Sequence, residues 1–159
     1  TISQPYVVAV MIEALQLKGG ERLLEVGAGS GYAAAVAAQI AGQVYAIERI
    51  PELAEQARSN LARAGIGNVE VRCADGSLGW PDAAPFDAIL VSAGGPSVPE
   101  VLKAQLAPLG CLVMPAGSER RAQRLLRITR GEDDHFEQED LGAVAFVPLI
   151  GECGWQEED

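Results

Sequence analysis

The sequence predicts an α/β protein built on a doubly wound, mostly parallel seven-stranded sheet, with helices on both faces and antiparallel C-terminal strands. Strand-like and helix-like segments alternate along most of the chain, which is the pattern of a parallel sheet with connecting helices. A glycine-rich turn joins the first strand to a helix, and a later apolar run is typical of a strand buried on both faces. The length of 159 residues and the 48% hydrophobic content indicate a single domain over residues 1–159.

The first half of the chain gives three predicted helices and three predicted strands. Helices are expected over 5–17, 32–40 and 51–65, and strands over 22–26, 43–48 and 69–73. Pro5 and Pro51 suit the first turn of a helix, and Gly19 and Gly65 are typical of the residues that end one. The first helix also repeats apolar side chains at helical spacing, and each strand is a short run between turn residues.

The second half is expected to complete the sheet. Strands are expected over 86–92, 110–115, 124–129 and 143–149, and a helix over 99–106. The segment 75–85, with two glycines and two prolines, is predicted to be a loop. The last two strands are expected to be antiparallel and joined by the acidic segment around His135.

The segment LLEVGAGSGY at 23–32 is the most informative part of the chain. Gly27, Gly29 and Gly31 can adopt backbone angles that are closed to other residues, so the turn can be tight and a ligand can approach the main chain. The spacing differs from the dinucleotide fingerprint, because Tyr32 stands where that fingerprint has its third glycine. With Glu25 first, the E-x-G-x-G-x-G spacing resembles the cofactor loop of S-adenosylmethionine-dependent methyltransferases. A tight connection without a ligand is the alternative.

Acidic residues follow the next two strands, at the edge of the sheet where open α/β proteins bind ligands. Glu48 ends the second strand, where its carboxylate can accept hydrogen bonds from ribose hydroxyls; capping of the next helix is the alternative. Asp75 and Gly76 follow the third strand, where the carboxylate can accept the adenine amino group and the glycine leaves room for the ring. A plain Asp-Gly turn is the alternative there. Consecutive strand ends therefore predict an adenosine site.

Charge and composition exclude several function classes. The 12 basic and 22 acidic side chains give a formal charge of -10, which repels phosphate backbones, so no nucleic-acid partner is expected. The sequence has no apolar run of about 20 residues and no signal peptide, which indicates a soluble, cytoplasmic protein with no membrane partner. Cys73, Cys111 and Cys153 are expected to be buried free thiols. The sole histidine, His135, lies in an acid-rich loop, so neither a metal site nor a hydrolytic triad is expected.

Motifs spread over nearly the whole chain resemble one family. They are TISQP at 1–5, LEVGAGSGY at 24–32, AIERIPELAEQAR at 46–58, DG and GW at 75–80, FDAILVSAG at 86–94 and FVPLIGECGW at 146–155. In this order they closely resemble the protein-L-isoaspartate (D-aspartate) O-methyltransferase family. The resemblance implies a Rossmann-like domain with S-adenosyl-L-methionine as cofactor. It also implies methyl transfer to the α-carboxyl group of L-isoaspartyl and D-aspartyl residues in damaged proteins or peptides, which starts their repair. We expect a monomer.

The same resemblance implies roles for individual residues. It makes Ser3 the active-site serine, near both the sulfonium and the acceptor carboxylate, with Thr1 and Ile2 lining the cleft. A helix cap is the alternative for Ser3. The cofactor residues it implies are Gly27, Ala28, Gly29 and Gly31 for the methionine and ribose part, Glu48 for the ribose, and Asp75 with Gly76 for the adenine. Backbone groups at 148–151 are implied to contact the substrate peptide.

The chain departs from the family pattern at three points. Family members carry an N-terminal helical segment before TISQP that helps to cover the active site, and this segment is absent here. Ile150 stands where threonine or valine is common, and Ser92 stands where threonine is common. Two other functions therefore stay open: methyl transfer to another acceptor, such as a small molecule or RNA, and cofactor binding without turnover.

Overall fold

The computed structural model describes residues 2–157, which form four α-helices, two short 3-10 helices and seven strands. The helices are α1 (Pro5–Ala14), α2 (Tyr32–Ala37), α3 (Pro51–Arg63) and α4 (Glu100–Ala104), with η1 (Gly76–Leu78) and η2 (Pro81–Ala83) in the predicted loop. The strands are β1 (Arg22–Val26), β2 (Gln43–Glu48), β3 (Val69–Cys73), β4 (Phe86–Val91), β5 (Leu106–Glu119), β6 (Ala122–Arg130) and β7 (Phe136–Val144).

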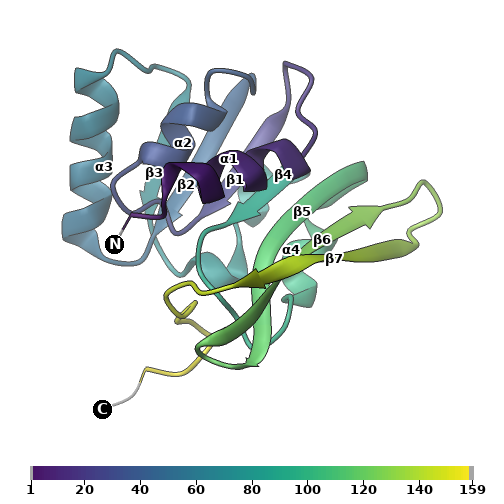
Figure 1. The fold of residues 1–159 in the computed structure, drawn as a ribbon. Helices are drawn as coiled ribbons and strands as arrows, with labels where there is room; N and C mark the ends of the chain where they lie inside the picture. The colour runs from purple at the N-terminus through teal and green to yellow at the C-terminus, as the bar shows by residue number, and fades with distance from the viewer. Residues whose placement is uncertain (1, 158–159) are drawn as a thin grey trace.

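All seven strands belong to one sheet, in the order β3-β2-β1-β4-β5-β6-β7 (Figure 1). Strands β1 to β5 run parallel, and β6 and β7 are antiparallel to their neighbours. The strand order reverses between β1 and β4, because β2 and β3 lie on one side of β1 and β4 lies on the other. The carboxyl ends of these parallel strands meet at one edge of the sheet, where ligands bind in such folds. The α/β sheet predicted from the sequence is confirmed.

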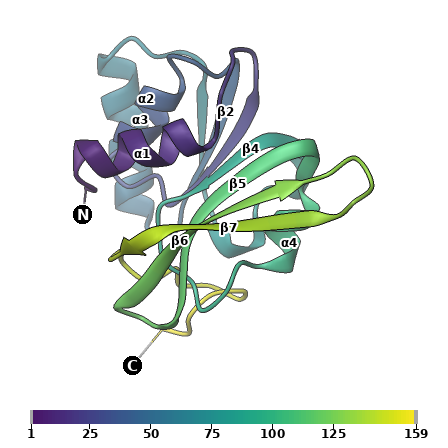
Figure 2. The ribbon, with the colours of Figure 1, turned by 45° about the vertical axis from the view of Figure 1, so that its right-hand side comes forward.

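The core has two layers, one on each face of the sheet. Side chains alternate between the faces along a strand, so Leu23 of β1 packs with α1 and α2 while Leu24 packs with α4. Figure 2 shows α1, α2 and α3 on one side of the sheet and α4 on the other. Ala34 and Ala37 of α2 are completely buried, and their small side chains let this helix lie close to the sheet.

The last strand lies earlier in the sequence than predicted. The prediction placed it over 143–149, where the residues are apolar, but β7 is the acidic segment Phe136–Val144. This segment pairs with β6, whose arginines form ion pairs with it: Arg124 with Asp140 and Arg127 with Glu139. These pairs suit an exposed edge strand that carries acidic side chains. The apolar residues after it leave the edge of the sheet and run to its carboxyl end.

Several other boundaries shift by a few residues. The first, second and fourth helices end earlier than predicted, at Ala14, Ala37 and Ala104. Strand β5 begins at Leu106 instead of 110, because Leu106 already pairs with Phe86 before an irregularity in the ladder. The main features of the predicted order are unaffected by these shifts.

Two of the three thiols are exposed, so the prediction of buried cysteines was wrong for them. Cys73 ends the edge strand β3 and Cys153 lies in a turn near the C-terminus, whereas Cys111 of β5 is partly buried. Burial raises the pKa of the Cys111 thiol to about 11. Within residues 2–157, no helix is long and apolar enough to cross a membrane, and no group of three or more metal-ligating side chains comes together.

Candidate functional site

Three adjoining cavities open at the carboxyl edge of the parallel strands. The first, here the Glu48 cavity, has a volume of about 310 Å³. Its walls combine the glycine turn after β1, the Glu48 carboxylate at the end of β2, and Gly76 after β3. Apolar side chains, among them Ile50 at the N-cap of α3 and Leu53 in its first turn, complete the wall. A polar end and apolar walls in one cavity suit a ligand with a hydroxylated part and a flat ring.

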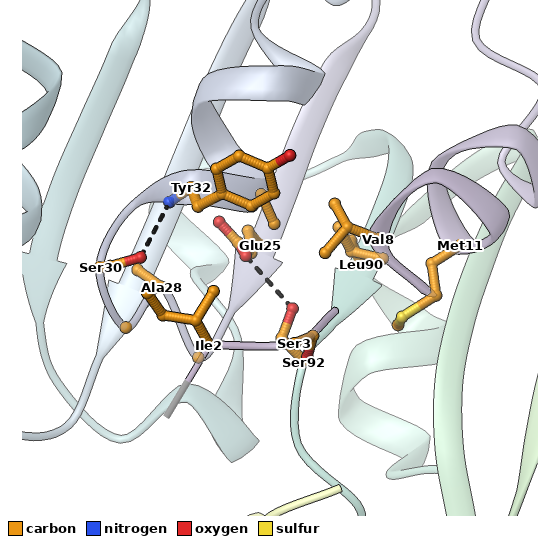
Figure 3. Close-up of a pocket in the computed structure, with 13 residues that line it drawn as sticks. Ile2, Ser3, Val8, Met11, Glu25, Ala28, Ser30, Tyr32, Leu90 and Ser92 are labelled. Carbon is orange, nitrogen blue, oxygen red and sulfur yellow. Dashed lines mark hydrogen bonds between the residues drawn. The ribbon is translucent and has the colours of Figure 1, made fainter. Parts of the chain in front are cut away.

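The second space, the Glu25 cavity, has a volume of about 50 Å³ and lies between the start of α1 and the glycine turn (Figure 3). Ser3, Glu25 and Ser92 line it, and Gly27 and Gly29 line both this cavity and the Glu48 cavity. The two cavities are therefore neighbours on the two sides of the glycine turn.

The third space, the Phe146 cleft, has a volume of about 380 Å³. It lies between the first residues of the described chain and the extended segment that follows β7, with Ser3 on one wall and Phe146 on the other. Ser3 also lines the Glu25 cavity, Val147 also lines the Glu48 cavity, and Ser92 lines all three spaces. A molecule in the cleft would meet one in the other cavities at these shared residues.

Glu48 is buried, and both of its carboxylate oxygens accept backbone hydrogen bonds. The amide of Gly29 donates to Oε2 over 2.8 Å and the amide of Ile50 donates to Oε1 over 3.1 Å. Ile50 is the N-cap residue of α3, and no side chain caps that helix, so the capping alternative for Glu48 does not hold. A carboxylate oxygen accepts two hydrogen bonds, so each still has capacity toward the cavity. Glu48 thus fixes the glycine turn and faces the same space.

Glu25 is completely buried inside β1, with an unusual electrostatic environment. The hydroxyl of Ser92 donates to Oε1 over 3.2 Å, while Oε2 has no hydrogen-bond partner among the described residues (Figure 3). Burial raises the pKa of Glu25 to about 8, and the nearby charge of Glu48 adds to this rise. A buried acceptor without a partner is costly, so a donor supplied by a ligand would relieve it.

Ser3 lies where the Glu25 cavity meets the Phe146 cleft, and it does not cap α1. The N-cap residue of that helix is Gln4, and no side chain makes a capping hydrogen bond to it. The carbonyl oxygen of Gln4 accepts the first helical hydrogen bond, from Val8 over 3.1 Å. The capping alternative for Ser3 is therefore wrong, and its hydroxyl is available to the two spaces that it lines.

Asp75 and Gly76 lie next to each other but face different surroundings. Gly76 lines the Glu48 cavity, whereas Asp75 lines a neighbouring groove. The Asp75 carboxylate accepts hydrogen bonds from the backbone and hydroxyl of Ser77 and from the backbone of Glu152 over 2.8 Å. These bonds hold the pKa of Asp75 below its usual value despite its partial burial. Here Asp75 caps η1 and holds the C-terminal turn through Glu152.

The remaining predicted site residues fall into three groups. Ile2 and Ala28 line the Glu25 cavity. Gly31 lines none of the three spaces: it is the left-handed N-cap of α2, and a Cβ there would lie 3.4 Å from Ala57 of α3. Thr1 lies outside the described residues.

Sequence reasoning missed two parts of the site. Ser92, noted only as a departure from a family pattern, follows β4 at the same edge as the other strand ends, and this position was the available signal. The second part is the role of 147–150 as a wall of the Glu48 cavity, because 143–149 were predicted to be strand and 148–151 were implied only to contact the substrate peptide. The path of this wall over the carboxyl edge depends on pairing with Gly94, a long-range contact that no local pattern encodes.

Comparison with known proteins connects this geometry to named relatives. A protein-L-isoaspartate O-methyltransferase 1 from Rhodopseudomonas palustris is 64% identical over 155 residues, and a protein-L-isoaspartate O-methyltransferase 2 from Marinobacter nauticus is 63% identical over 155. Both alignments cover 98% of this chain, and they cover 63% and 71% of the relatives. The chain therefore spans less than two thirds of the first relative's length.

Solved structures agree with these relatives. A protein-L-isoaspartate O-methyltransferase superposes with a TM-score of 0.88 at 32% identity, over 96% of this chain and 49% of the other. A β-aspartate methyltransferase from Plasmodium falciparum, in complex with S-adenosyl-L-homocysteine, gives 0.78 at 29% identity, over 94% and 76%. A family model described as protein-L-isoaspartate(D-aspartate) O-methyltransferase matches residues 1–154. The chain thus belongs to the protein-L-isoaspartate (D-aspartate) O-methyltransferase family.

Proposed function

We propose that this chain transfers a methyl group from S-adenosyl-L-methionine to the α-carboxyl group of L-isoaspartyl and D-aspartyl residues in damaged proteins or peptides. The observation that carries the proposal is the meeting of three spaces at Ser92, two of which Ser3 also lines. One space suits a nucleoside, one offers a buried carboxyl group, and one is an open cleft beside an extended backbone. Family membership, from the match over residues 1–154, supports the same reaction.

The described residues fit the cofactor. Glu48 would accept hydrogen bonds from the ribose hydroxyls, and the ring would lie between apolar walls beside Gly76. Oε2 of Glu25, which has no partner among the described residues, would accept a hydrogen bond from the ammonium group of the methionine part. This ammonium would also stabilise the ionised form of Glu25. When bound, the cofactor supplies a methyl group that its positive sulfur already activates.

The acceptor needs orientation more than activation. A carboxyl group with an ordinary pKa near 4 is ionised at pH 7, so no general base is required. The hydroxyl groups of Ser3 and Ser92 would donate hydrogen bonds to this carboxylate and hold one oxygen toward the methyl group. A misplacement of about 1 Å can cost on the order of a hundredfold in rate, and the carboxyl of a normal aspartyl residue sits at a different distance along the backbone. Selectivity then follows from geometry.

The test has two stages and uses the chain of residues 1–159. Calorimetry first measures binding of S-adenosyl-L-homocysteine, and labelled methyl transfer is then compared between matched isoaspartyl and aspartyl peptides. We expect binding, and transfer to the isoaspartyl peptide alone. Transfer to RNA or small carboxylic acids without transfer to the peptide would overturn the acceptor. Binding without any transfer would leave a cofactor-binding module, and no binding would overturn the proposal.

We also propose that the chain works as one methyltransferase unit, as a monomer in the cytoplasm, with neither nucleic acid nor membrane as a partner. All three cysteines are free, which is typical of proteins in reducing compartments. The charge of -10 disfavours contact with phosphate backbones. Light scattering on the purified chain measures its mass against the 16.7 kDa of one copy.

A further inference from the structure

We propose that Gln123 is a positioning residue for the acceptor: its buried side chain holds the wall of the Phe146 cleft in place. This inference rests on the proposed function, because it assigns the cleft to the substrate peptide. Gln123 lies in β6, is only 2% exposed, and lines none of the three spaces of the site. It would therefore act through Phe146, and it would not touch the reacting atoms.

The Gln123 amide pairs with both backbone groups of Phe146. The amide nitrogen of Phe146 donates to Oε1 of Gln123 over 2.8 Å, and Nε2 of Gln123 donates to the carbonyl oxygen of Phe146 over 3.1 Å. Nε2 also donates to the carbonyl oxygen of Arg120 over 2.6 Å. A carboxamide offers a donor and an acceptor side by side, as a peptide group does. Gln123 thus takes the place of a neighbouring strand for Phe146.

This contact lies where the chain leaves the edge of the sheet. The backbone pairing of β6 with β7 ends at Gln123 and Val144, so Phe146 has passed the last rung of that ladder. The next residues pair instead with Gly94 after β4: its amide donates to Val147 and its carbonyl oxygen accepts from Leu149, each over 2.8 Å. Gln123 fills the gap between these two pairings.

The fit between Gln123 and Gly94 is specific. A Cβ atom on Gly94 would lie 2.4 Å from both Cδ and Nε2 of Gln123, so the amide occupies the space that a larger residue at 94 would need. Gly94 and the Gln123 amide are therefore in direct contact, and both pair with the extended segment 146–149. Because Gly94 holds residues 147 and 149 on its own, loss of the Gln123 contacts would free Phe146 and the cleft side of the wall. The wall of the Glu48 cavity would stay in place.

The test replaces Gln123 by methionine, which has a similar unbranched shape and lacks the amide. We expect the KM for an isoaspartyl peptide to rise about tenfold with kcat changed less than about twofold, because substrate alignment depends on the cleft wall. The Kd of S-adenosyl-L-homocysteine should stay within about twofold. Hydrogen exchange of the Phe146 amide should become faster. Gln123→Glu keeps the acceptor for the Phe146 amide but sets a carboxylate oxygen against the carbonyl oxygens of Phe146 and Arg120, so its peptide KM should rise at least as far as that of Gln123→Met.

Gln105→Met is the matched control. Gln105 is also a buried glutamine whose amide pairs with backbone groups, those of Trp80 and Leu78, and it lines none of the three spaces. The Gln105→Met substitution should lower the melting temperature and leave the peptide KM unchanged. Equal peptide KM values for wild type and Gln123→Met would overturn the inference, as would an equal rise in Gln105→Met. A wild-type chain that methylates no isoaspartyl peptide would instead overturn the proposed function. In that case, equal hydrogen exchange of the Phe146 amide in wild type and Gln123→Met would show that Gln123 does not fix Phe146 either.

Discussion

Glu25 is the residue whose surroundings depart furthest from those of a carboxyl group in water. Its pKa is raised from the ordinary 4.5 to about 8, so the folded state keeps a proton that the unfolded state releases. A group with a raised carboxyl pKa therefore lowers the free energy of unfolding progressively as pH rises from about 4.5 to about 8. Glu25→Gln removes this titration. We expect the ligand-free variant to gain stability over wild type with rising pH, on the order of 4 kcal/mol at pH 8.

Urea unfolding at pH 5, 6.5 and 8 measures this gain without any assay of activity. The same substitution should weaken binding of S-adenosyl-L-homocysteine, because the neutral amide cannot match a carboxylate as partner for an ammonium group. A stability difference that is the same at all three pH values would contradict the assignment of the raised pKa to Glu25.

Substitution of Ser3 should affect turnover and leave stability nearly unchanged, since Ser3 makes no capping hydrogen bond to α1. Ser3→Ala should reduce kcat by on the order of a hundredfold, because the acceptor carboxylate would lose a donor that aligns it with the methyl group. Its free energy of unfolding should change by less than about 0.5 kcal/mol. Ser59→Ala, on the exposed side of α3, serves as the control and should change neither. Intact turnover with a lower melting temperature would show that Ser3 has only a structural role.

Among the elements, the end of β3 shows how tightly the strand ends are packed. A Cβ atom on Gly76 would lie 2.6 Å from Cγ1 of Val26, a buried side chain of β1. Gly76→Ala should therefore cost about 1–3 kcal/mol of stability and also weaken cofactor binding, because Gly76 lines the Glu48 cavity. Gly67→Ala is the control, since nothing lies within 4 Å of a Cβ there. Thermal unfolding and calorimetry compare the two variants. Equal melting temperatures and equal ligand affinities for Gly76→Ala and Gly67→Ala would contradict this prediction.

The elements that could be predicted are those with a local cause. The glycine turn and Glu48 can be predicted from local sequence, because a strand, a tight turn and a helix start follow one another within a few residues. The position of β7 could not be found in this way: the apolar FVPLI looks more like a strand than the acidic FEQEDLGAV. Ion pairs with the arginines of β6 decide the matter, and these depend on a register that only the folded sheet defines. The hold of Asp75 on Glu152 is likewise a long-range contact.

For the whole molecule, the net charge of -10 sets a long-range electrostatic field that acts on any charged peptide. The long-range field attracts cationic peptides and slows anionic ones, and it weakens as salt shortens the Debye length. At close range, Arg120 and Arg121 line a groove beside Phe146 and add local positive charge to that part of the surface.

We therefore expect kcat/KM to be higher for an isoaspartyl peptide with flanking lysines than for one with flanking glutamates. The ratio should shrink severalfold between about 0.01 M and about 1 M salt, as the Debye length falls from about 30 Å to about 3 Å. An uncharged isoaspartyl peptide should change little over the same range. A ratio that does not respond to salt would show that the preference arises from local contacts instead of the field.

The exposure of Cys73 and Cys153 allows a fluorescent label to report ligand binding at the site. Cys153 sits on the turn that Asp75 and Ser77 fasten, with its amide bonded to the Ser77 hydroxyl over 3.0 Å, while the raised pKa of Cys111 leaves little thiolate there near neutral pH. A maleimide dye would consequently label the thiols of Cys73 and Cys153 and leave that of Cys111 unlabelled. After Cys73→Ser, the single remaining fluorophore at 153 would report by its emission how the adjoining segment responds when a nucleoside enters, with the reacting groups left untouched.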